Sequence, residues 1–121
     1  MLIKDFYHIE NHTTESDGSN IYTVRLNAEH DVYKGHFPEK PITPGVCNIQ
    51  MIKECVEDML SKRLTFTAID RCRLTAMVTP GGSPILNIKV SVDNADAHKV
   101  NATIFYGETT YMTLSGTIAE K

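Results

Sequence analysis

Residues 36–46, which read HFPEKPITPGV, combine a histidine with a stiffened loop and a helix-start signal. Proline fixes its own backbone angle and restricts the residue before it, so Pro38 and Pro41 should hold His36 in few conformations. An imidazole, with an unperturbed pKa near ~6.5, can move protons at neutral pH. We therefore take His36 as the candidate general base. The alternative is a structural histidine bonded to a loop carbonyl.

The Pro44-Gly45 pair offers a hydrogen-bond donor for a carbonyl oxygen. Proline suits the first helical turn, where the N–H is unpaired anyway, and glycine leaves its free amide open to close approach. The helix dipole would strengthen that amide as an oxyanion donor. A base beside such a donor can act on a carbonyl compound. The alternative is that Gly45 only starts the helix.

Gln50 and Glu54 lie one turn apart on a polar stripe of the helix expected over residues 44–62, and the stripe continues to Glu57 and Ser61. If the stripe meets a cavity, Glu54 could act as an acid or base and Gln50 could orient a water. The alternative is that these positions are ordinary solvated ones.

One long helix and several strands must position these residues. The apolar stripe of the helix consists of Ile49, Ile52, Val56, Met59 and Leu60. Residues 2–10 form a short strand or an irregular lead-in, and 28–43 form a loop. Strand patterns cover 21–27, 66–78, 86–92, 100–106 and 110–118, with turns at Gly18-Ser19, Pro80–Gly82 and Gly107-Glu108. This order predicts an α+β layout, an antiparallel sheet wrapped around one helix.

Length and composition exclude several classes of protein. A chain of 121 residues fits one domain, 1–121. A net charge of −3, without a basic block and without Trp, argues against a nucleic-acid partner. No apolar run of ~20 residues exists to span a membrane. Cys47, Cys55 and Cys72 lack metal-ligand spacing, and we expect them to be buried, reduced thiols in a cytoplasmic protein.

Arg71 and Arg73 are two residues apart on an expected strand and so share one face. They could bind an acidic partner or phosphates. The alternative, which we favour, is a solvent-facing side of the strand.

The loop and helix start together resemble one enzyme family. The run His36-Phe37-Pro38, then Pro41, then Pro44-Gly45-Val46 and the helix, is similar to the bacterial 3-hydroxyacyl-(acyl carrier protein) dehydratases. Residues 68–71 through Pro80-Gly81 resemble the strand after the helix in that family and its turn. The resemblance implies the hotdog fold, in which an antiparallel sheet wraps around a long helix, and a site shared by two subunits of a homodimer.

The resemblance also implies roles for individual residues. His36 matches the catalytic histidine, and Gly45 matches the glycine whose amide binds the thioester carbonyl. Phe37 and Val46 are expected to contact the substrate beside it. The helical acid of the family falls fourteen positions after the histidine, where this chain has Gln50. The family often has Gln one turn later, where this chain has Glu54, so the pair is present in reversed order.

Three functions follow from this interpretation. The leading one is dehydration of a 3-hydroxyacyl thioester carried by acyl carrier protein or coenzyme A, with His36 as base, Gly45 as carbonyl donor, and Gln50 or Glu54 contacting the hydroxyl or water. This reaction needs no metal or redox cofactor. A hotdog thioesterase, in which the helix orients a hydrolytic water, is the second. A non-catalytic acyl-binding partner subunit is the third, because Gln50 stands where the acid is usual.

Overall fold

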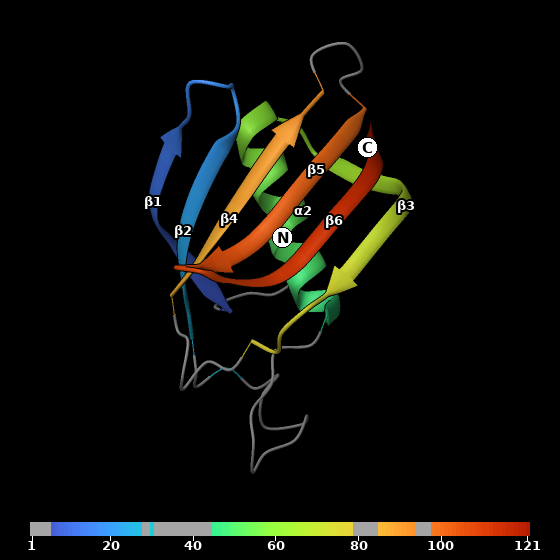
Figure 1. The fold of residues 1–121 in the computed structure, drawn as a ribbon. Helices are drawn as coiled ribbons and strands as arrows, with labels where there is room; N and C mark the ends of the chain where they lie inside the picture. The colour runs from blue at the N-terminus through green and yellow to red at the C-terminus, as the bar shows by residue number, and fades with distance from the viewer. Residues whose placement is uncertain (1–5, 28–29, 31–44, 79–84, 94–97) are drawn as a thin grey trace.

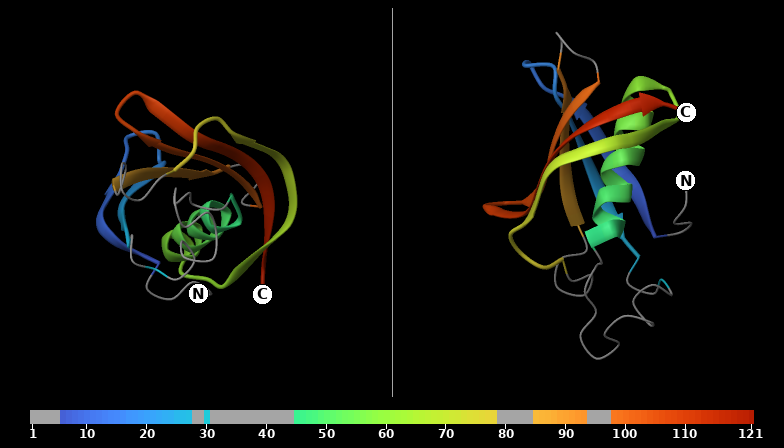
Figure 2. Two further views of the ribbon diagram at one scale, coloured as in Figure 1. Left: turned by 90° about the horizontal axis from the view of Figure 1, so that it is seen from below. Right: turned by 90° about the vertical axis from the view of Figure 1, so that its right-hand side faces the viewer.

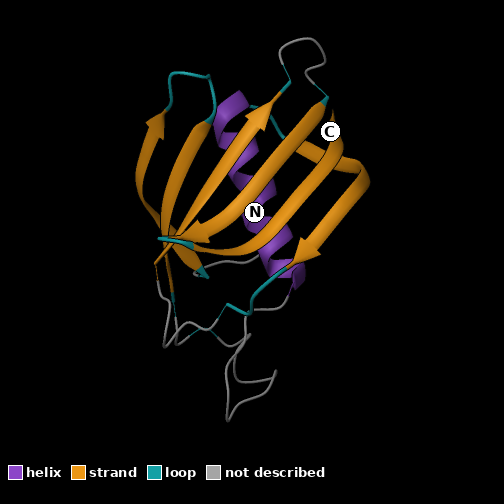
Figure 3. Cartoon of the chain, in the orientation of Figure 1, coloured by secondary structure: helices purple, strands orange, loops and turns teal. Residues whose placement is uncertain are grey.

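The structure is a computed structural model, and it describes residues 6–27, 30, 45–78, 85–93 and 98–121. Its elements follow in the order β1 (Tyr7–Thr14), β2 (Asn20–Leu26), α2 (Gly45–Leu60), β3 (Leu64–Leu74), β4 (Ile85–Val92), β5 (Lys99–Tyr106) and β6 (Thr109–Glu120). The expected order of strands around a single long helix is confirmed for the described residues (Figure 3).

The strands form one six-stranded sheet with the order β1-β2-β4-β5-β6-β3, and every neighbouring pair is antiparallel. β1 and β3 are therefore the two edges of the sheet. The sheet curls around α2, so that the helix lies along its concave face (Figures 1 and 2). This is the hotdog arrangement that the resemblance implied.

The core lies between the helix and the concave face of the sheet. Alternate residues of β2 and β4 point inward and are fully buried: Tyr22, Val24, Leu86, Ile88 and Val90. The helix meets them with Cys47, Met51, Ile52, Cys55 and Val56. The alternation expected along these strands is confirmed, because successive side chains point to opposite faces and here separate a buried face from a less buried one.

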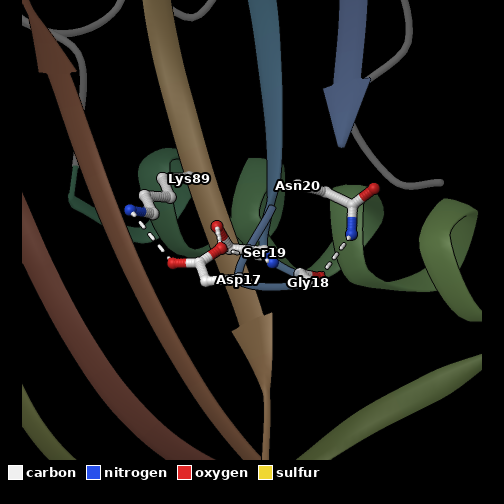
Figure 4. A network of polar contacts seen from close by, with 5 residues as sticks. All are labelled: Asp17, Gly18, Ser19, Asn20 and Lys89. Carbon is white, nitrogen blue, oxygen red and sulfur yellow. Dashed lines mark hydrogen bonds and ion pairs between the residues drawn. The ribbon is translucent and has the colours of Figure 1, made fainter. Parts of the chain in front are cut away.

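Two turns hold neighbouring strands in register. Asp17 closes the β1–β2 hairpin: its Oδ1 accepts hydrogen bonds from the backbone N–H of Ser19, at 2.9 Å, and from the Ser19 hydroxyl, at 2.6 Å. Its Oδ2 lies 4.0 Å from Nζ of Lys89 on β4 (Figure 4). These contacts lower the pKa of Asp17, chiefly through the Ser19 hydrogen bonds. At the other turn Gly107 takes a φ of +59°, which confirms the β5–β6 hairpin expected there.

Several expectations about element bounds need correction. The first strand, Tyr7–Thr14, lies later than the lead-in expected over residues 2–10, and the strand expected over residues 66–78 begins at Leu64 and ends at Leu74. β3 lies at the edge and is exposed over most of its length, so Cys72 is exposed rather than buried. Cys47 and Cys55 are buried as expected. The buried face of α2 is also turned from the expected stripe, because it includes Met51 and Cys55, while Ile49, Met59 and Leu60 are only partly buried.

Candidate active site

The helix start that the sequence singled out is open in the described part of the chain. α2 begins at Gly45, and a Cβ on Gly45 would meet no described atom within 4 Å other than those of the adjoining residues and of the backbone of its own helix. Val46 is 72% exposed. The described residues therefore leave the side of Gly45 where a Cβ would stand open, at the positive end of the helix dipole.

His36 and Phe37 lie outside the described residues, as do the prolines of their loop. The proposed pairing of His36 with the Gly45 amide therefore stays a prediction. What the structure does describe is the helix that follows, with Gly45, Val46, Gln50 and Glu54 on it.

Gln50 and Glu54 contact each other directly, and Glu54 has a second partner, Tyr7. Nε2 of Gln50 donates a hydrogen bond to Oε2 of Glu54 at 2.8 Å. The other carboxyl oxygen, Oε1, accepts a hydrogen bond from the hydroxyl of Tyr7 at 2.6 Å. Both oxygens of Glu54 are thus occupied as acceptors, and both bonds fall in the short range of charge-assisted hydrogen bonds. Glu54 is therefore not the ordinary solvated residue of the alternative interpretation.

Tyr7 is the member of this group that the sequence did not reveal. It stands on β1, 47 residues before Glu54, and its side chain packs against the core. Burial, and then the Glu54 carboxylate, raise the pKa of Tyr7 well above its usual range. The phenol is therefore a hydrogen-bond donor throughout the neutral range. Its position in an ambiguous lead-in segment carried no local signal, since only the pairing of β1 with β2 brings it to the helix.

The polar residues beyond Glu54 are structural. Asp58, which was not part of the expected stripe, lies one turn further on, and its Oδ2 accepts a hydrogen bond from the Tyr22 hydroxyl at 2.7 Å. Oε2 of Glu57 accepts one from the backbone N–H of Leu64 at 2.8 Å, which joins the end of α2 to the start of β3. Ser61 ends the helix with a φ of +55°. Only the Gln50–Glu54 part of the stripe lies toward the open helix start.

Asn48 is a second polar residue that sequence reasoning missed. Its side chain is fully buried on the face of α2 that also carries Met51 and Ile52. Among the described residues, neither its Nδ2 nor its Oδ1 finds a hydrogen-bond partner. Such a group costs folding free energy, roughly 1–3 kcal/mol. Asparagine in the first turn of a helix is an ordinary polar residue by sequence pattern, so nothing local marked its burial.

Arg71 and Arg73 do share one face of β3, as expected. They stand opposite Ser115 and Thr113 of β6 and are exposed. Their neighbour Asp70 lies 3.5 Å from Nζ of Lys99. The described contacts therefore fit the solvent-facing alternative.

The described residues offer neither a metal site nor a membrane-spanning helix. His, Cys, Asp and Glu side chains in that part of the chain do not gather in groups of three that could hold a metal ion. No helix there has the length and apolar character needed to cross a membrane.

The fold is similar to that of solved proteins. The chain matches a structure described as the dehydratase heterocomplex ApeI:P from Xenorhabdus doucetiae, with a TM-score of 0.79, 18% identity, and coverage of 93% of this chain and 97% of that one. It also matches an uncharacterised protein from Erwinia carotovora subsp. atroseptica, with a TM-score of 0.70, 15% identity, and coverage of 94% and 92%. The hotdog fold is therefore shared with a dehydratase structure over almost the whole chain.

Two curated relatives that match the chain by sequence share one description. The 3-hydroxyacyl-[acyl-carrier-protein] dehydratase FabZ of Macrococcus caseolyticus is 26% identical over 111 residues, 85% of this chain and 77% of the relative. The FabZ of Thermoanaerobacter sp. (strain X514) is 31% identical over 72 residues, 54% of this chain. That match spans about half, 51%, of the length of the relative.

The sheet curled around one helix is the hotdog fold. The family model for ApeI-like proteins, described as ApeI dehydratase, matches residues 11–113. The chain belongs to this ApeI-like dehydratase family.

Proposed function

We propose that this chain removes water from a 3-hydroxyacyl thioester and leaves the trans-2-enoyl thioester. The observation that carries the proposal is the Gln50 carboxamide, held by Glu54 at 2.8 Å on the same helix whose start at Gly45 is open. Gln50 lies five residues after Gly45, or about 7.5 Å along the helix axis. That spacing suits a thioester carbonyl at the helix start and a hydroxyl further along.

The proposed reaction begins with proton abstraction. His36 takes the α-proton, and the electrons of that C–H bond move toward the thioester carbonyl. The Gly45 amide and the helix dipole stabilise the negative charge that develops on the carbonyl oxygen. Phe37 and Val46 flank the reacting part of the acyl chain. Gly45 offers this donor because its missing side chain lets the oxygen approach the backbone.

In the proposed reaction, no general acid on the helix protonates the leaving hydroxyl. A carboxamide binds a hydroxyl but has no proton to give, and both oxygens of Glu54 already act as acceptors. We therefore assign the second step to the imidazolium formed in the first. It returns the proton to the leaving oxygen as the C–O bond breaks, and water departs. Gln50 accepts the hydroxyl hydrogen and so turns the oxygen lone pairs toward the imidazolium.

The carrier and compartment are proposed from the relatives. FabZ proteins are described as acting on acyl-carrier-protein substrates, so we propose an acyl carrier protein thioester, with coenzyme A as the alternative carrier. No metal or redox cofactor takes part in the proposed steps. Free thiols at Cys47, Cys55 and Cys72 favour a reducing compartment, which we take to be the cytoplasm.

We also propose that residues 1–121 act as one hotdog domain within a homodimer. β3 is an edge strand of the sheet, and Ile69, Leu74 and Cys72 are exposed along it. A long edge with unpaired backbone groups is a template for pairing with another strand. Alkylation of Cys72 tests the interface: its rate should fall as protein concentration rises through the dimer dissociation constant, and a concentration-independent rate speaks against this edge.

The experiment for the reaction is a His36→Ala variant assayed for dehydration of 3-hydroxyacyl-(acyl carrier protein). Loss of the general base should lower kcat by about 10²–10⁴-fold. Unchanged turnover in a folded variant would overturn the mechanism. Release of free carrier thiol in place of enoyl product would identify a thioesterase instead.

A second candidate function is a non-catalytic partner subunit. The amide at position 50 favours it, and a relative of the same fold is described as a dehydratase heterocomplex. The purified chain would then be inactive alone and would gain turnover in Gln50→Glu. Activity of the purified native chain removes this candidate.

A further inference from the structure

Three side chains from β1 and α2 form a continuous hydrogen-bonded chain, and the proposed reaction has used only its last member. The Tyr7 hydroxyl donates to Oε1 of Glu54 at 2.6 Å, and Nε2 of Gln50 donates to Oε2 at 2.8 Å. Both of these hydrogen bonds end on the Glu54 carboxylate. They leave the second N–H of Gln50 and its Oε1, which is the acceptor at the end of the chain.

The orientation of the Gln50 amide follows from the chemistry of its partner. A carboxylate accepts hydrogen bonds and cannot donate them, so the amide must turn its nitrogen toward Glu54. Turning the amide over would place two acceptor oxygens against each other. As long as Glu54 stays in place, Oε1 of Gln50 faces away from it.

Tyr7 is what keeps Glu54 in place. Glu54 stands on a half-buried face of the helix, and a glutamate there would otherwise sample several rotamers. The phenol of Tyr7 is rigid beyond two torsions, is packed against the core, and is carried by a strand paired with β2. It therefore fixes one carboxyl oxygen from the sheet side, which leaves the other for Gln50.

We propose that Tyr7 is a positioning residue, which acts through Glu54 to hold the Gln50 carboxamide with Oε1 toward the substrate. The inference rests on the proposed function, and it predicts which of two acyl chains, 3-hydroxyacyl or 3-oxoacyl, binds better. A ligand that offers a hydroxyl hydrogen, the 3-hydroxyacyl chain, satisfies that oxygen. A 3-oxoacyl chain offers no hydrogen there and leaves Oε1 of Gln50 unpaired, so it should bind more weakly.

The experiment compares Tyr7→Phe with a matched control, Tyr22→Phe. Each change removes one tyrosine hydroxyl that donates to a carboxylate of α2, at 2.6 Å for Glu54 and 2.7 Å for Asp58. Only the Tyr7 contact continues to Gln50. We expect kcat for the 3-hydroxyacyl substrate to fall about tenfold in Tyr7→Phe with KM nearly unchanged, because orientation is lost in the transition state. Tyr22→Phe should keep both constants within about twofold.

A second measurement does not depend on turnover. The side-chain amide signal of Gln50 in a ¹⁵N NMR spectrum, assigned by its loss in Gln50→Glu, should shift in Tyr7→Phe and stay in Tyr22→Phe. Glu54→Gln is the second variant: it can still accept from Tyr7, but its new amide can donate to Gln50 and turn that side chain over. We expect it to lower kcat more than Tyr7→Phe does.

The possible failures are distinguishable. An unshifted Gln50 signal, or equal kcat losses in Tyr7→Phe and Tyr22→Phe, overturns the positioning role while leaving the dehydratase proposal intact. A native protein without dehydratase activity overturns the proposed function and the catalytic part of this inference. The NMR comparison then decides the remaining part, whether Tyr7 orients Gln50.

Discussion

Two tyrosine–carboxylate contacts lie one helical turn apart between α2 and the first two strands, and they differ in what lies behind them. Tyr22 is fully buried, stacks on His12 with ring centroids 4.1 Å apart, and donates to Asp58 at the exposed side of the helix. Tyr7 is partly buried and donates to Glu54, whose second oxygen accepts from Gln50. The acceptor of the first contact, Asp58, is exposed to solvent, whereas the acceptor of the second, Glu54, also binds the candidate active-site amide of Gln50.

Two hydrogen bonds of nearly the same length can therefore have different roles, one in packing and one in the proposed reaction, depending on which residues their acceptors contact next. Removing either tyrosine hydroxyl should cost a similar free energy of unfolding, about 1 kcal/mol. Only the loss of the Tyr7 hydroxyl should also lower kcat for the proposed reaction. Substitutions around the two contacts, and a change of pH, can test this difference between stability and activity.

The largest expected effect comes from exchanging the two helix residues of the Tyr7 chain. In the double variant Gln50→Glu with Glu54→Gln, the Tyr7 hydroxyl can donate to the amide oxygen introduced at position 54. The nitrogen of that amide can donate to the carboxylate introduced at position 50, so the hydrogen-bonded chain survives. The exchange supplies the helical acid that the native chain lacks. We expect kcat for dehydration to rise by about 10²-fold, the lower range for general acid catalysis.

The control for this exchange is Glu54→Gln alone, which should lose activity. An unchanged or lower kcat in a folded double variant would mean that the absence of a helical acid does not limit the reaction. The imidazole would then already supply the proton at full rate.

Asp58→Leu should lower the stability of the fold without lowering the rate of the proposed reaction. It leaves the fully buried Tyr22 hydroxyl without its acceptor, which should cost about 1–3 kcal/mol in the free energy of unfolding measured in urea. The kcat of the folded variant should stay within about twofold of the native value. A tenfold fall in kcat would show that the two contacts are coupled rather than independent.

Alkaline pH should weaken the interface that contains both contacts. Burial first, and then the bonded carboxylate, raise the pKa of Tyr7 and of Tyr22 above the usual range, and burial raises the pKa of Cys55 to about 12. The folded state then holds protons that the unfolded chain loses above its own pKa values, ~8.5 for cysteine and ~10 for tyrosine. Stability is therefore full below about pH 8.5 and falls as pH rises through this range.

Urea midpoints between about pH 8 and 11 measure this fall, which is at most about 1.4 kcal/mol per pH unit for each group. Replacing Tyr7 or Tyr22 by Phe should flatten the slope above about pH 10, and Cys55→Ala should flatten it between about pH 9 and 10. A slope that none of the three substitutions changes would contradict these assignments.

The smallest effect concerns access to Cys55, which lies between Glu54 and Asp58 in the sequence and is fully buried. Its thiol should react with iodoacetamide far more slowly than in the urea-unfolded chain, because burial hides it and raises its pKa. Peptide mass spectrometry would follow the rate. Losing either tyrosine hydroxyl should speed the reaction only a few-fold, since each removes about one hydrogen bond.

Local patterns predicted the elements that repeat regularly. Alternation along β2 and β4, the long helix α2 and glycine at the Gly107 turn appear as expected, although the buried face of α2 is turned from the expected stripe. The edge strands were less predictable, because a strand at an edge need not bury either face and so loses its alternation. β1 and β3 are exposed over most of their length, and their bounds and the exposure of Cys72 were accordingly misjudged.

The residues of the candidate site likewise fall into those that the sequence indicated and those that it did not. Gly45, Gln50 and Glu54 were visible as a helix start and a polar pair at helical spacing, and the family followed from the same motif. Tyr7 and the buried Asn48 were not visible. The first depends on the pairing of β1 with β2, and the second depends on how far the helix is rotated about its axis against the sheet.

The order of the elements, the curled sheet around one helix and the family could be read from the amino-acid sequence, since these rest on periodicity and on motifs within short segments. Which polar groups meet became apparent only in the folded chain. A hydrogen bond requires its two atoms within about 3 Å, and 47 residues of chain separate Tyr7 from Glu54. Local sequence patterns do not determine such a distance. It depends on the register of β1 against β2 and on the rotation of α2 about its axis against the sheet.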